Sequence, residues 1–199
     1  MEGYCTDIFF DAAINFARKQ TESGKPFFSY IATNAPHGPF DDVPQELYEE
    51  YKQVDFSPIL VNDLPAKRRS AEFDKLARIS AMIINIDQNV GKLFASLDKL
   101  GIRENTIVLY LNDNGPNSRR YVGNMRGNKT QVDYGGIRSP LLFHWPAKVD
   151  ASDTTDVMLA HIDLMPTLLD ACGVAVPESA ALDGKSFLPL LTGEMDDSQ

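Results

Sequence analysis

The chain has 199 residues, of which 43% are hydrophobic and 24% charged, the composition of an ordinary globular domain able to bury a core. Its 28 acidic and 19 basic residues give a formal net charge of -9, which argues against nonspecific binding to nucleic acid or anionic membranes. No segment approaches the roughly 20 consecutive apolar residues of a membrane span. Cys5 and Cys172 lack zinc-ligand spacing, so we predict two buried free thiols.

The first third of the chain predicts a helix followed by a strand. Apolar side chains recur at helical spacing in residues 7–19. Residues 27–32 form a short aromatic and β-branched run, which predicts a buried strand ending in the loop at 34–39. The polar, proline-containing stretch that follows, up to Pro65, predicts a surface excursion rather than a core element.

The rest of the chain alternates between helical and strand patterns. Residues 70–100 place apolar side chains on one face of a long helix. The apolar runs at 106–111 and 141–145 predict two further strands, and residues 162–171 predict another helix. Alternating strands and helices favour an α/β fold in which a mostly parallel sheet is flanked by helices.

Polar residues follow two of the predicted strands, where ligands bind in open α/β sheets. Asp113 and Asn114 offer one anionic and one neutral oxygen, which suit calcium or magnesium better than zinc. An Asp-Asn-Gly sequence is, however, more often a simple turn. His37 lies between Pro36 and Gly38, where an imidazole can bind an anionic oxygen or donate a proton, although a lone loop histidine is more often structural.

Residues 119–138 are basic within an otherwise acidic chain, with Asp133 as the only acid. The basic residues are Arg119, Arg120, Arg126, Lys129 and Arg138. This reversal predicts an anion pocket, in which a lysine would act as a compact positive charge for a sulfate or phosphate oxygen. A solvated basic loop explains the same composition equally well.

Taken together in chain order, several segments resemble the sulfatase family of the alkaline-phosphatase-like superfamily. They are NAPHGPF at 34–40, LNDNG at 111–115, GGIRSP at 135–140, HIDLMPT at 161–167 and LPLLTG at 188–193. The resemblance implies that Asp113 and Asn114 bind Ca²⁺, or Mg²⁺ in its place. It also implies that His37 and Lys129 contact the sulfate group of a sulfated small molecule or glycan.

The resemblance further implies one partial catalytic domain over residues 1–199, incomplete at both ends. The part that bears the nucleophile would be absent, and the carboxy-terminal subdomain largely absent. The family's nucleophile is a formylglycine made from cysteine in a C-x-[PS]-x-R context, which neither Cys5 nor Cys172 matches. We therefore expect sulfate-ester hydrolysis from a complete protein, in a periplasmic, secreted or lysosome-like compartment, and an inactive isolated chain. Tyr134 stands where the family usually has Glu before the glycine pair.

Two alternatives remain open from the sequence. A phosphatase or phosphonate hydrolase of the same superfamily would share the metal-bearing strand ends, although residues 34–40 favour a sulfatase. A catalytically dead protein that binds calcium or a sulfated glycan would need no nucleophile. Neither the particular substrate nor the oligomeric state can be read from the sequence.

Overall fold

The computed structural model describes residues 2–60, 64–118, 120–151, 154–177 and 179–195. Two compact units make up the chain. The first comprises residues 1–103 and 110–142, and the second comprises residues 104–109 and 143–199. The side chains predicted to bind metal and sulfate all belong to the first unit.

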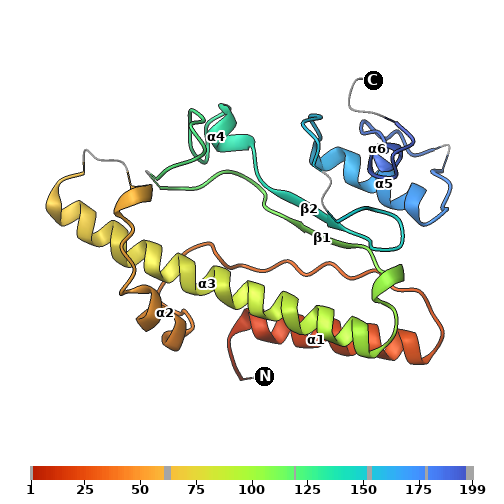
Figure 1. Ribbon diagram of the computed structural model, residues 1–199, viewed down its shortest axis with the longest axis horizontal. Coiled ribbons are helices and arrows are strands. Elements are labelled where there is room, and N and C mark those ends of the chain that lie inside the picture. Colours follow the sequence, from red (N-terminus) through yellow and green to blue (C-terminus); the bar gives the residue numbers. More distant parts are fainter. Residues whose placement is uncertain (1, 61–63, 119, 152–153, 178, 196–199) are drawn as a thin grey trace. The chain divides into compact units, whose positions relative to one another are not determined.

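The first unit is built on α3, a helix from Ala66 to Lys99 (Figure 1). Helix α1 (Cys5–Glu22) and helix α2 (Gln45–Tyr51) both pack against it. In Figure 1, α1 lies along the carboxy-terminal half of α3 and α2 lies near its amino-terminal half. The helices predicted at 7–19 and 70–100 are therefore confirmed. No helix among the described residues is long and apolar enough to cross a membrane.

A polar cluster joins α1 to α3. The side-chain amides of Asn85 and Asn89 both donate hydrogen bonds to the carboxylate of Asp7, over 3.0 and 2.6 Å. Asn89 is completely buried, and its amide also donates to the Asn85 carbonyl over 2.8 Å. Buried polar groups are stable only when they are hydrogen-bonded, so this cluster specifies how the two helices align.

We predict that Asn89→Ala lowers the free energy of unfolding by about 1–3 kcal/mol, because Asp7 loses a donor in a buried position. The control is Gln88→Ala, one residue earlier on the exposed face of α3, which should change stability by less than about 0.5 kcal/mol. Urea unfolding followed by circular dichroism measures both variants. Equal stabilities for the two would show that the cluster contributes nothing.

The stretch predicted as a surface excursion instead supplies core residues, so that prediction was wrong. Tyr48 of α2 is buried, and Val43, Phe56 and Leu60 are buried with it against α3. A short helical turn, η1 (Ser57–Ile59), separates the last two. Prolines mark turns, but they do not prevent the apolar residues between them from turning inward.

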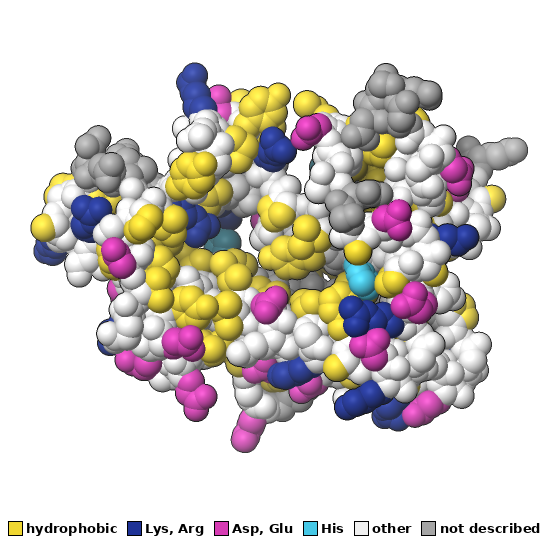
Figure 2. Space-filling model, in the orientation of Figure 1, with side chains coloured by type: hydrophobic (Ala, Val, Ile, Leu, Met, Phe, Trp, Pro, Cys, Tyr) yellow, Lys and Arg dark blue, Asp and Glu magenta, His cyan; other side chains and the backbone are white. Residues whose placement is uncertain are grey.

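Residues 27–32 are extended, but they belong to no strand of the described chain, so the predicted buried strand is wrong. Phe28 and Tyr30 are 75% and 81% exposed. At the amino-terminal end of the run, the ring of Phe27 meets that of Phe16 on α1 edge-on, with centroids 6.3 Å apart. Figure 2 shows hydrophobic side chains over much of the visible surface. Besides Phe28 and Tyr30, the exposed hydrophobic residues include Val132 and Leu142.

The sheet of the described chain has two strands, β1 (Val108–Leu111) and β2 (Leu141–His144), which run antiparallel. A short helical turn, η2 (Arg103–Asn105), precedes β1. The strands predicted at 106–111 and 141–145 exist, but the mostly parallel sheet flanked by helices does not form within the described residues. The reason is topological: β2 returns beside β1 after the short helix α4 (Tyr134–Ile137), rather than after a parallel crossover.

The second unit centres on α5 (Leu164–Ala171), which follows the short η3 (His161–Asp163) and confirms the helix predicted at 162–171. The hydroxyl of buried Thr167 donates to the Asp163 carbonyl over 2.7 Å. It also accepts the backbone N–H of Phe187 over 3.0 Å, just before α6 (Leu188–Leu191). One hydroxyl thus joins the two helices of this unit.

Both cysteines are free, as predicted, but exposed rather than buried. Cys5 is the first residue of α1, and Cys172 directly follows the last residue of α5. Helix ends face solvent more often than helix centres, and the prediction took no account of that position. Neither thiol forms a disulfide.

Candidate functional site

Asp113 and Asn114 lie in the loop that follows β1, as predicted. Asp113 is exposed and Asn114 is half-buried. The amide nitrogen of Asn114 donates to the carbonyl of Gly115 over 3.0 Å. This bond commits the nitrogen and leaves the amide oxygen available beside the carboxylate of Asp113. The loop therefore offers two neighbouring oxygens of the kind that hard cations prefer.

Glycines allow this loop to pack closely against α4. The backbone N–H of Gly115 donates to the carbonyl of Gly136 over 2.8 Å. A Cβ placed on Gly115 would lie 1.9 Å from the Gly135 carbonyl oxygen, and one on Gly135 would lie 2.2 Å from the Gly127 carbonyl oxygen. Real side chains cannot approach backbone so closely, so these positions require glycine for contact rather than for a special φ.

Lys129 lies in a loop that is hydrogen-bonded through its backbone to the end of the Asp113 loop. Its backbone N–H donates to the carbonyl of Pro116 over 3.1 Å. The side-chain amide of the neighbouring Asn128 donates to the carbonyl of Ser118 over 2.7 Å. Lys129 itself is half-buried. The structure thus brings together two segments that were predicted separately, one for metal and one for an anion.

Of the other basic residues of 119–138, Arg120 and Arg126 each contact groups other than Lys129. Arg120 pairs with Leu60 in an isolated bridge, and burial lowers the pKa of its guanidinium, an effect that the charge of Glu72 opposes. Arg126 is exposed, with its Nε 3.6 Å from a carboxylate oxygen of Asp133. Arg119 lies outside the described residues.

His37 is exposed at the tip of a turn. Its backbone N–H donates to the carbonyl of Asn34 over 2.9 Å, and its Nδ1 lies 2.8 Å from the carbonyl of Gly38. A carbonyl can only accept, so Nδ1 carries the proton in this contact. The other ring nitrogen, Nε2, is not used by this contact.

Two basic residues of α3, Lys75 and Arg78, contact the loops that carry His37 and Asp113. Neither was predicted as a site residue. Arg78 donates to the carbonyl of Phe40 over 2.9 Å, at the end of the His37 loop. The ammonium of Lys75 lies 5.8 Å from the centre of the Phe40 ring and donates to the carbonyl of Asn117 over 3.0 Å. Lys75 therefore contacts both the His37 loop and the chain that follows Asp113. The signal in the sequence was a pair of bases, three residues apart, on a mainly apolar helix.

Arg78 is itself fixed by Asp74 and Tyr48. Its Nε donates to the Asp74 carboxylate over 2.8 Å, and its guanidinium stacks 4.5 Å from the centre of the Tyr48 ring. The Tyr48 hydroxyl donates to the same carboxylate over 2.5 Å. These two hydrogen bonds, first from Tyr48 and then from Arg78, hold the pKa of Asp74 below its usual value. The pKa of Tyr48 is raised, chiefly by its bond to Asp74.

The four predicted side chains are thus carried by loops that α3 and the glycine contacts hold. Within the described part of the chain, no hydrogen bond or ion pair joins the side chains of His37, Asp113, Asn114 and Lys129 to one another.

A profile of the sulfatase family matches residues 2–174, and the chain belongs to this family. Similar solved structures include sulfatases with the alkaline-phosphatase-like fold, so the predicted fold family is confirmed even though the described chain does not form the predicted sheet.

Three similar proteins give the scale of the match. The uncharacterized sulfatase YdeN of Escherichia coli K12 is 29% identical over 193 residues, covering 96% of this chain and 31% of its own. The N-acetylglucosamine-6-sulfatase of Bos taurus is 30% identical over 207 residues, covering 96% of this chain and 36% of its own. The crystal structure of Ps i-CgsB with k-i-k-neocarrahexaose has a TM-score of 0.80 and 29% identity, covering 99% of this chain and 40% of its own. The chain spans about a third of the length of these two curated relatives.

Proposed function

We propose that this chain supplies one part of a sulfate-ester hydrolysis site. In a complete sulfatase, Lys129 and His37 would contact the sulfate group, and Asp113 and Asn114 would hold a divalent metal. The observation that supports this most is the backbone hydrogen bond from Lys129 to Pro116, because it joins the segment of the lysine that we assign to sulfate to the loop of the two oxygens that we assign to a metal. Lys75 adds a contact from α3 to both the His37 loop and the Asp113 loop.

The proposed charges suit a sulfate ester. Lys129 is a compact positive charge for a sulfate oxygen. His37, with Nδ1 donating to Gly38, would in its doubly protonated form also donate from Nε2 to a second sulfate oxygen, or give that proton to the leaving oxygen when the bond breaks. Both groups would stabilise charge that develops on the sulfuryl group during transfer.

The chemistry of Asp113 and Asn114 fits Ca²⁺, or Mg²⁺ in its place, but only as part of a site. Ca²⁺ takes roughly six to eight oxygen ligands, and these two residues supply two side-chain oxygens. No group of three or more His, Cys, Asp or Glu residues that could hold a metal occurs within the described ranges. The bound ion would stabilise negative charge on the sulfate. We therefore propose weak metal binding by this chain alone.

The proposed substrate is a sulfated glycan or a sulfated small molecule. The N-acetylglucosamine-6-sulfatase among the relatives is named for a sulfated amino sugar, and Ps i-CgsB was solved with k-i-k-neocarrahexaose. Both relatives are about 30% identical to this chain, so the glycan is the class that we favour for it.

The direct test of the proposed site is binding rather than turnover. Titrating inorganic sulfate into the isotope-labelled chain should shift amide NMR signals in residues 126–131, and Lys129→Ala should weaken that binding about tenfold. Lys148→Ala, which removes an exposed lysine of the second unit, is the matched control. Calcium should shift the signals of residues 112–116, and Asp113→Asn should abolish this effect while Asp150→Asn does not. If each variant behaves like its control, the proposed site is wrong.

A further inference from the structure

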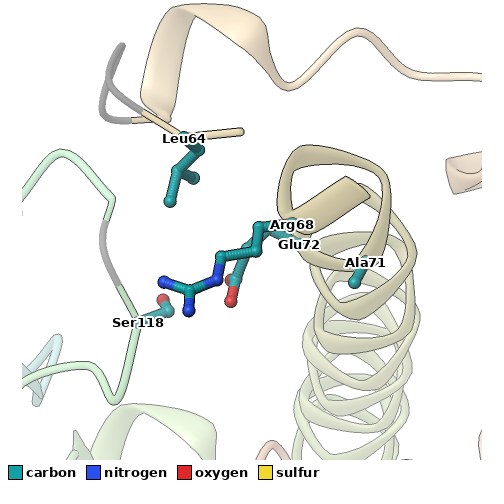
Figure 3. Close-up of a pocket in the computed structure, with 5 residues that line it drawn as sticks. All are labelled: Leu64, Arg68, Ala71, Glu72 and Ser118. Carbon is teal, nitrogen blue, oxygen red and sulfur yellow. The ribbon is translucent and has the colours of Figure 1, made fainter. Parts of the chain in front are cut away.

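A cavity of about 430 Å³ lies between the amino-terminal part of α3 and the chain that follows the Asp113 loop (Figure 3). It belongs entirely to the first unit. Its lining residues come from α3, from the segment before it and from the loop after β1: Leu64, Arg68, Ala71, Glu72 and Ser118. The volume is in the lower part of the range of roughly 300–1,000 Å³ that is typical of small-molecule sites.

Two buried polar atoms of this cavity could form hydrogen bonds with a ligand that has hydroxyl groups. The carboxylate oxygen Oε2 of Glu72 and the hydroxyl of Ser118 are both buried and have no hydrogen-bond partner within the described chain. Leaving such atoms unpaired costs free energy, which a bound donor would recover. Figure 3 shows the guanidinium of Arg68 reaching across the cavity toward Ser118. Arg68 forms no ion pair with any other described residue.

The cavity lies next to the chain that is bonded to the Lys129 loop. Ser118, on its wall, accepts a hydrogen bond through its carbonyl from Asn128, the neighbour of Lys129. Pro116, two residues before Ser118, accepts the backbone N–H of Lys129. The wall of the cavity is therefore hydrogen-bonded to the loop that carries the lysine proposed to contact sulfate.

We infer that this cavity binds an uncharged sugar ring adjoining the sulfated residue of a glycan, a subsite that rests on the proposed function. Sugar hydroxyls both donate and accept, so one ring can donate to Glu72 and accept from Arg68. Its C–H face can pack on Leu64 and Ala71. A second sulfate suits the cavity less well, because the Glu72 carboxylate only accepts hydrogen bonds and would repel it.

The test compares three probes on the 199-residue chain: inorganic sulfate, a galactose–N-acetylglucosamine disaccharide, and the same disaccharide sulfated at the 6-position of its amino sugar. We expect the sulfated disaccharide to bind more tightly than inorganic sulfate. Arg68→Gln and Glu72→Gln should each weaken its binding about tenfold while leaving inorganic sulfate unchanged. Lys67→Gln, on the exposed surface of the same helix, should have no effect on any probe.

Different results distinguish the cavity from the sulfate site. If Lys129→Ala weakens the sulfated disaccharide but Arg68→Gln and Glu72→Gln do not, the subsite is wrong and the proposed function stands. If Arg68→Gln also weakens inorganic sulfate, the cavity binds anions and the sugar assignment is overturned. If Lys129→Ala alters neither inorganic sulfate nor the sulfated disaccharide, the proposed sulfate contact fails.

Discussion

The 199-residue chain should not hydrolyse 4-nitrophenyl sulfate above the uncatalysed rate. Neither cysteine stands in the C-x-[PS]-x-R context from which sulfatases make formylglycine. Cys5 lies at the start of α1 and Cys172 after the end of α5, so neither belongs to the loops that carry His37 or Lys129. In a well-measured hydrolase, removing the nucleophile costs roughly 10⁶-fold in kcat. A loss of that size places the remaining rate below detection.

This expectation needs a control for folding, because an unfolded chain is also inactive. The same preparation should bind inorganic sulfate and lose that binding in Lys129→Ala. This result would distinguish a folded chain with an incomplete site from an unfolded chain. Turnover by pure protein that disappears in His37→Ala would contradict the expectation. It would also show that the groups in this chain suffice for attack by water, without a covalent intermediate.

The helices were the most predictable part of the fold, because their signal is local. The apolar spacing at 70–100 required one face to be buried, and α3 buries Leu76, Ala77 and Leu97 of that pattern. Helix α5 was predictable for the same reason. Helix α2 was missed because it has only seven residues and its buried Tyr48 is surrounded by charged side chains.

The sheet was less predictable, because a strand depends on partners that are distant in sequence. Residues 27–32 have the composition of a buried strand, yet Phe28 and Tyr30 face solvent. A buried strand needs hydrogen-bonding neighbours and covered faces, and no described segment provides them for this run. The apolar composition predicted a buried strand, and the described chain does not form one.

For the candidate site, the sequence indicated residue types, and the contacts between their loops came from the structure. The residue types in the Asp113–Asn114 pair and the basic segment suggested metal and anion binding, and the structure joins their loops through the Lys129–Pro116 bond. Nothing in the sequence pattern showed that Lys75 and Arg78 would hold these loops. Such contacts link residues about 40 positions apart, and no local periodicity reports them.

Replacing glycine by alanine should have opposite effects on stability at two positions, Gly115 in the Asp113 loop and Gly91 in α3. Gly115→Ala should destabilise the chain by about 3 kcal/mol, because its Cβ would lie 1.9 Å from the Gly135 carbonyl oxygen and backbone cannot move away cheaply. Gly91→Ala should stabilise it by about 0.5–1 kcal/mol. Gly91 lies on the exposed face of α3 with nothing within 4 Å of the added Cβ, and alanine favours the helix.

Urea unfolding measures both changes, and NMR then separates a local from a global effect. In Gly115→Ala, the amide signals of residues 112–116 and 126–136 should move, because the bond from Gly115 to Gly136 cannot form at its present length of 2.8 Å. Sulfate binding should weaken with it, since the loop of Lys129 is bonded to the displaced segment. Signals from α1 should stay in place, because that helix packs on α3 and not on these loops. If both alanine variants shift stability in the same direction, the glycine contact does not support the candidate site.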